Sequence, residues 1–111
     1  MLRVFICSPY RAADFEKRIA NVDLAWRMMD MAMREGFAPY APHLLYPHFL
    51  NDDSPRDRSL AIAAGLEWLA VSDEVWVPYG VAVTDGMKEE LTIAKQLRKK
   101  IIERTINVMP S

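Results

Sequence analysis

The sequence predicts one α/β domain built on a parallel sheet of four or five strands, and three observations support this. Short β-rich apolar segments alternate with long amphipathic segments along the whole chain. The first short segment is almost continuously apolar, which is typical of a central parallel strand. The 111 residues are 51% hydrophobic, enough for one ordinary core, and no linker divides them. We therefore expect residues 1–111 to form a single Rossmann-like or flavodoxin-like domain with three layers.

The first half of the chain supplies two strands and one long helix. The first strand is predicted over 2–7 and is broken by Ser8-Pro9-Tyr10. A long amphipathic helix follows over 13–35, with Gly36 as its terminator. This helix contains four methionines, which fill gaps in a core or in a subunit interface: Met28, Met29, Met31 and Met33. A second strand is predicted over 37–41, closed by Pro42.

The second half begins with an aromatic stretch over 43–53, predicted to be a loop or an irregular helix. Ser54-Pro55 is a helix cap followed by proline at the first helical position, and this helix extends to about Val71. A third strand is predicted over 73–78 and a loop over 79–85. The last helix runs from about Gly86 to Lys99, and a final strand starts at 101.

Charge and cysteine content exclude several classes of protein. Fourteen Lys and Arg against 15 Asp and Glu give a net charge of −1, which offers no electrostatic footprint for a nucleic acid polymer or an anionic membrane. The N-terminal apolar stretch is too short for a secretory signal, and no stretch approaches transmembrane length. A single cysteine excludes an internal disulfide and a Cys-rich metal site. We expect a soluble cytoplasmic protein.

The predicted topology locates a ligand crevice. In parallel sheets, ligands bind outside the carboxyl ends of the strands. Three segments reach that edge: 8–11 after the first strand, 42–43 after the second, and 79–85 after the third. We therefore expect Ser8, Tyr10, Arg11 and His43 to line the crevice. The glycine-rich phosphate loops of nucleotide-binding folds are missing from the sequence, and no cofactor is predicted.

Glu90 is the strongest candidate for chemistry. On a helical wheel it points into the centre of an apolar stripe formed by Met87, Leu91, Ile93, Ala94 and Leu97. A carboxylate facing a core is unfavourable by several kcal/mol unless it is paired, hydrogen-bonded or protonated. Glu90 also lies one turn into the helix that follows the third strand, so it faces the crevice. The alternative is a buried salt bridge to Arg11 or Arg58.

The other candidates each have two interpretations. Thr84-Asp85-Gly86 presents backbone N–H groups and a hydroxyl to an anion, although Asp85 is itself a cap candidate and Gly86 alternatively serves a tight turn. Arg11 is either a phosphate clamp or a solvated residue, and Tyr10 either packs on the sheet or contacts the substrate. His43 and His48 lack metal-like spacing, and Cys7 is a small buried hydrophobe. Arg56 and Arg58 are more typical of a solvated helix face, although Arg58 can also reach the crevice.

Three segments resemble one enzyme superfamily. They are Val-Phe-Ile-Cys-Ser-Pro-Tyr-Arg at 4–11, Gly-Leu-Glu-Trp-Leu-Ala-Val-Ser-Asp-Glu-Val-Trp-Val at 65–77, and Thr-Asp-Gly-Met-Lys-Glu-Glu-Leu at 84–91. The chain resembles the nucleoside 2-deoxyribosyltransferase-like superfamily, including its 2'-deoxynucleoside 5'-monophosphate N-glycosidases. A closer resemblance is to small uncharacterised bacterial and phage domains of that superfamily, which carry a stretch similar to Ala-Pro-His-Leu-Leu-Tyr-Pro-His-Phe-Leu at 41–50.

The resemblance implies a mechanism and a set of roles. Glu90 matches a nucleophile that attacks the anomeric carbon of a sugar, after which the base leaves and water or another base resolves the intermediate. Thr84 matches a hydroxyl that holds a 5'-phosphate or sugar, and Arg11 matches a phosphate-binding arginine. Tyr10 is assigned to catalysis, and the expected substrate contacts are Ser8, Arg11, His43, Thr84, Asp85, Gly86 and Met87.

Two positions depart from the superfamily pattern. The aspartate that protonates the leaving base falls at Gly65, and a tyrosine of the first strand falls at Phe5. A positioned acid is typically worth about 10²–10⁴-fold in rate. Either another group replaces it, the options being Asp52, Asp53, His43 and Tyr10, or the site binds without turnover.

Three hypotheses follow. The first is an enzyme that cleaves or transfers at the N-glycosidic bond of a nucleoside or nucleoside 5'-monophosphate through Glu90. The second is a non-catalytic nucleotide-binding module, favoured by Gly65 and Phe5. The third is an oligomeric interaction domain in which Glu90 is part of a buried ion pair. A homodimer or higher homo-oligomer is expected, because the Met-rich helix, Trp26 and the 43–50 segment are more apolar than a lone small domain requires.

Overall fold

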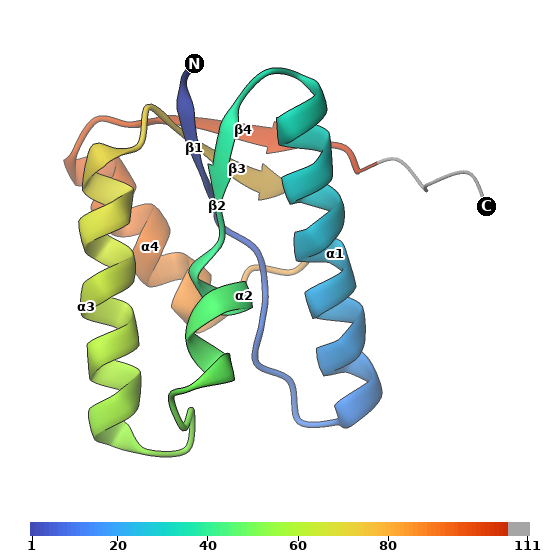
Figure 1. Ribbon diagram of the computed structural model, residues 1–111, viewed down its shortest axis with the longest axis vertical. Helices are drawn as coiled ribbons and strands as arrows, with labels where there is room; N and C mark the ends of the chain where they lie inside the picture. Colours follow the sequence, from blue (N-terminus) through green and yellow to red (C-terminus); the bar gives the residue numbers. More distant parts are fainter. Residues whose placement is uncertain (107–111) are drawn as a thin grey trace.

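Four parallel strands form the central sheet of the computed structural model, which describes residues 1–106 (Figure 1). The strands lie in the order β2 (Ala38–Tyr40), β1 (Arg3–Ile6), β3 (Glu74–Pro78) and β4 (Lys100–Arg104). Three longer helices connect them: α1 (Phe15–Arg34), α3 (Pro55–Val71) and α4 (Asp85–Gln96). The predicted α/β class and the parallel sheet are confirmed.

The alternation of side chains along β1 separates the two faces of the sheet. Val4 and Ile6 pack with α1 residues in one apolar cluster, together with Trp76 of β3. Phe5 and Cys7 point the other way, into a second cluster that includes Leu69 of α3 and Met87 of α4. The domain therefore has three layers, with α1 on one face and α3 and α4 on the other (Figure 1).

The long helix α1 packs on the sheet through small residues. Ala25, Met28 and Ala32 are its buried residues, and the two alanines allow a close approach to the strands. Met28 is the only fully buried member of its four methionines, whereas Met33 is 60% exposed. Trp26 is also 54% exposed, so these residues do not belong to the core of the described chain.

Helix boundaries agree with the sequence in two places and differ in a third. Gly36 adopts φ of 89°, which ends α1 in the left-handed region that glycine tolerates. Ser54 caps α3 by accepting the N–H of Asp57 at 3.3 Å. The cap of α4 is Thr84, whose hydroxyl oxygen accepts the N–H of Met87 at 3.2 Å. The helix thus begins at Asp85, and the assignment of Asp85 as a cap was wrong.

The aromatic stretch after β2 is a short helical connection. It consists of α2 (Pro42–Leu45) and the 3₁₀ turn η1 (Tyr46–His48), as the expectation of an irregular helix allowed. The Tyr40 and Tyr46 hydroxyls share a hydrogen bond of 2.6 Å, which ties this connection back to β2. Within residues 1–106, no helix is both long and apolar enough to cross a membrane.

Candidate functional site

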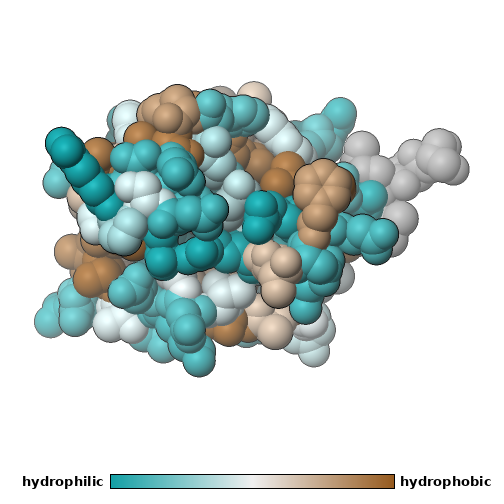
Figure 2. Space-filling model, turned by 90° about the horizontal axis from the view of Figure 1, so that it is seen from below, coloured by the Kyte–Doolittle hydropathy of each residue, from teal (hydrophilic) through white to brown (hydrophobic). Residues whose placement is uncertain are grey.

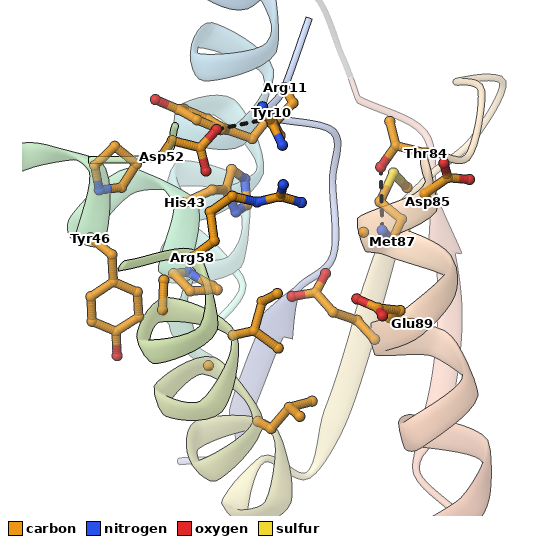
Figure 3. A pocket seen from close by; sticks show the side chains of 18 of the residues that line it. Tyr10, Arg11, His43, Tyr46, Asp52, Arg58, Thr84, Asp85, Met87 and Glu89 are labelled. Carbon is orange, nitrogen blue, oxygen red and sulfur yellow. Dashed lines mark hydrogen bonds and ion pairs between the residues drawn. The ribbon is translucent and has the colours of Figure 1, made fainter. Parts of the chain in front are cut away.

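A pocket of about 860 Å³ opens between α4 on one side and the α2–η1 and α3 segments on the other (Figure 3). It lies beyond the carboxyl ends of β1 and β2, where the parallel topology placed the crevice. All nine residues predicted for the site line it: Ser8, Tyr10, Arg11, His43, Thr84, Asp85, Gly86, Met87 and Glu90. Their roles stay predictions, but the fold brings them together.

Glu90 is a desolvated carboxylate in the wall of this pocket. Burial, and secondarily the negative charge of Glu89, raise the pKa of Glu90 from its ordinary 4.5 to about 7, although a hydrogen bond with Cys7 acts in the opposite direction. No Arg or Lys forms an ion pair with Glu90 among residues 1–106. The alternative of a buried salt bridge to Arg11 or Arg58 is therefore not found within this chain.

Cys7 lies directly beside the Glu90 carboxylate. It is fully buried at the end of β1, and its thiol also lies 3.8 Å from the carbonyl oxygen of Met87. Burial and the neighbouring Glu90 raise the pKa of Cys7, so the group remains a protonated thiol that donates a hydrogen bond. The sequence interpretation of Cys7 as a buried hydrophobe was incomplete. The alternation of β1, which places Cys7 on the same face as Phe5, was the available clue.

Ser8 and His43 form a hydrogen-bonded pair in the same pocket, with His43 across it from α4 (Figure 3). The Ser8 Oγ and His43 Nε2 atoms are 2.8 Å apart, and both residues line the pocket. Burial lowers the pKa of His43 from 6.5 to about 4, so the imidazole is neutral at pH 7. The ring of Tyr10 lies 6.2 Å from the His43 ring, which places its phenol at the same end of the pocket.

Two arginines reach the pocket, and they differ in their partners. Arg11 Nε lies 2.9 Å from Asp52 Oδ2, so its charge is balanced within the protein. Arg58 extends its guanidinium from α3 over the pocket (Figure 3). Within residues 1–106 no carboxylate pairs with Arg58. Arg58 was assigned to a solvated helix face with the crevice as its alternative, and the folded chain brings it to the pocket.

The start of α4 offers polar groups to a ligand. Thr84 lines the pocket; its hydroxyl oxygen caps the helix, and among residues 1–106 its hydroxyl donates no hydrogen bond, so it is available to a ligand. Gly86 has no atom within 4 Å of the place a Cβ would occupy, and its φ is not positive. A tight turn therefore does not explain Gly86. The missing side chain instead leaves the first turn of the helix open to the pocket.

The two positions that depart from the superfamily pattern have different surroundings. Gly65 is buried in the pocket wall, where an added Cβ would lie 3.6 Å from Pro42, an ordinary contact. Phe5 is fully buried and packs against Tyr40 at 6.3 Å between ring centres. Among the proposed substitutes for the acid, Asp53 does not line the pocket and Asp52 is paired with Arg11. The imidazole of His43 is unprotonated at pH 7, which leaves Tyr10.

The pocket has no visible arrangement for a metal. In the described part of the chain, no group of three or more His, Cys, Asp or Glu side chains is placed to hold an ion. The Nε2 atom of His43 is already hydrogen-bonded to the Ser8 hydroxyl.

Comparison with known proteins identifies a family. Residues 2–104 match the family described as "Domain of unknown function (DUF7768)". The chain belongs to this family. Among solved structures, the fold is similar to a 2-deoxyribosyltransferase from the psychrotolerant bacterium Bacillus psychrosaccharolyticus, with a TM-score of 0.67, 18% identity, and coverage of 97% of this chain and 77% of that protein. No curated protein sequence matches the chain.

Proposed function

We propose that this domain, residues 1–111, cleaves or transfers at the N-glycosidic bond of a nucleoside or nucleoside 5'-monophosphate, with Glu90 as the nucleophile. The observation that carries the proposal is a desolvated carboxylate without an ion-pair partner among the described residues, facing a large pocket. The fold it shares with a protein characterised as a 2-deoxyribosyltransferase supports the same chemistry.

The geometry suits a double displacement. The Glu90 carboxylate attacks the anomeric carbon, the base leaves, and a glycosyl ester forms that water or a second base resolves. The Cys7 thiol orients the carboxylate through its hydrogen bond. Two side chains of α3 that line the same pocket, Ile62 and Leu66, give its wall an apolar surface. Arg58 and the Thr84 hydroxyl are placed to hold a phosphate or the sugar.

The test is direct. Purified protein is incubated with a panel of nucleosides and 5'-monophosphates, and free base is followed by chromatography, with Glu90→Gln in parallel. Base release from the wild type and not from Glu90→Gln is expected, and exposed Glu67→Gln on α3 should behave as the wild type. Base release that survives in Glu90→Gln would remove Glu90 from the mechanism.

A second candidate function is a non-catalytic nucleotide-binding module. Gly65 favours it, because no carboxyl group stands at that position of the pocket wall. Thermal stabilisation by a nucleotide without any base release would establish this function instead.

We further propose a homodimer or higher homo-oligomer. Several large apolar side chains are exposed on the single chain, including Trp26, Met33 and Phe49. The face seen in Figure 2 carries mainly hydrophilic residues with separate hydrophobic ones, so on that side the exposed apolar residues do not merge into one patch. Light scattering of the purified protein tests the mass directly.

A further inference from the structure

Ser8 and His43 form a part-buried hydrogen-bonded pair in the pocket that the nucleophilic step does not use. Ser8 is 5% exposed, and its hydroxyl contacts His43 Nε2 at 2.8 Å. Figure 3 shows His43 across the pocket from α4, which carries Thr84, Met87 and Glu89. A sugar bound between the walls would thus have the nucleophile on one side and His43, with its Ser8 partner, facing it from the other part of the pocket.

A second step of the proposed reaction requires a base in that position. Water that resolves a glycosyl ester of Glu90 must lose a proton as it attacks. The other carboxylates that line the pocket are poorly suited to accept it. Asp85 and Glu89 belong to α4, the same helix as the nucleophile, and both are exposed.

The remaining two carboxylates are already engaged. Asp52 is paired with Arg11 at 2.9 Å. Asp57 Oδ2 accepts the backbone N–H of Asn51 at 2.8 Å. His43 is different, because it lies across the pocket from α4 (Figure 3) and its Nε2 already contacts Ser8 Oγ at 2.8 Å, so a proton can pass between them.

We propose that Ser8 and His43 act as a proton relay that activates the resolving water, which makes this site a hydrolase. The inference rests on the proposed function of Glu90. In this step the water oxygen forms a bond to the anomeric carbon, and the bond from that carbon to the Glu90 oxygen breaks, with the electron pair returning to the carboxylate. The water proton moves to Ser8 Oγ while the Ser8 proton moves to His43 Nε2. The imidazolium then releases its proton to solvent as the free sugar leaves.

The relay predicts a specific kinetic defect. In His43→Gln the first step still occurs, so about one equivalent of base per site should appear in a rapid burst, followed by turnover reduced about 10²-fold or more. Mass spectrometry should then detect a sugar adduct on the protein. Azide attacks without losing a proton, so it should restore turnover in His43→Gln and form a glycosyl azide.

Controls separate this inference from a structural role and from the proposed function. His48→Gln changes the second histidine, which is exposed and outside the pocket, and should turn over as the wild type. Ser8→Ala interrupts the relay while keeping His43, and should show the same burst and azide rescue even if His43→Gln does not fold. Wild-type turnover in both variants, or loss of the burst together with turnover and without azide rescue, overturns the relay. A wild type that releases no base from any substrate overturns the proposed function itself and the relay with it.

Discussion

Replacing Glu90 by glutamine should stabilise the protein above neutral pH, which is the opposite of what a buried ion pair would give. The pKa of Glu90 is raised from 4.5 to about 7, mainly by burial. At 1.36 kcal/mol per pKa unit, keeping this carboxylate charged in the folded state costs roughly 3 kcal/mol. Glutamine has nearly the same shape and carries no charge at any pH.

The sign of the pH dependence follows from proton binding. Between pH 4.5 and about 7 the folded chain holds a proton on Glu90 that the unfolded chain has lost. The wild type therefore loses stability as the pH rises through this range, and the full loss is present above about 7. Glu90→Gln should match the wild type near pH 4.5. At pH 8 the free energy of unfolding of Glu90→Gln should exceed that of the wild type by roughly 1–3 kcal/mol, less than the full cost of the charge because the buried amide also loses some hydration.

Urea unfolding at pH 4.5 and pH 8 measures this difference. Glu67→Gln, an exposed carboxylate outside the pocket, is the matched control and should change stability by less than about 0.5 kcal/mol at either pH. A loss of about 3–5 kcal/mol in Glu90→Gln at pH 8 would refute the reasoning, because that is the signature of a broken buried ion pair.

Three further predictions address the neighbours of Glu90. Because the nucleophile must be charged, kcat/KM should rise with pH to a plateau above about 7. Cys7→Ala should move this rise to higher pH, whereas Cys7→Ser, which keeps a hydrogen-bond donor, should not. The pH–rate profiles of both variants with one substrate check these expectations. If a 5'-monophosphate is the substrate, Arg58→Gln should raise its KM about tenfold or more and leave the KM of the matching nucleoside unchanged. Arg11→Gln should have a smaller effect in the same assay, because the charge of Arg11 is already balanced by Asp52. Gly65→Ala should stabilise the protein by about 0.5–1 kcal/mol in urea unfolding, since alanine favours the helix and its Cβ would meet Pro42 at an ordinary 3.6 Å. A destabilised variant would show that the pocket wall around Gly65 is packed more tightly than this distance indicates.

Much of the fold follows from local sequence features. The apolar run at 4–7, the Ser54-Pro55 cap and the left-handed Gly36 each act within a few residues, so they predicted β1 and the boundaries of α3 and α1 before any tertiary contact was known. The parallel order then places the ends of β1 and β2 at one edge, which is why the predicted site residues meet in one pocket.

Local rules were less successful where two signals competed. Asp85 and Thr84 are both good caps, and only the backbone geometry decided that Thr84 accepts the helix N–H. Likewise, Trp26 and Met33 belong to the apolar pattern of α1, yet the sheet selects the stripe with the smaller residues Ala25 and Ala32. Close packing, rather than hydrophobicity alone, determines which face of that helix is buried.

The sequence by itself determined the α/β class, the parallel sheet, and the position of Glu90 on a helix that follows β3. Only the tertiary structure decided which groups stand beside that carboxylate. Ser8 and His43 are 35 residues apart in the chain, and Cys7 and Met87 are 80 apart, so no local pattern relates them. Their contacts, and the pairing of Arg11 with Asp52 that leaves Arg58 over the pocket, depend on how the layers pack. The pKa of Glu90 and of His43 depends on the same burial, and burial is a property of the folded chain.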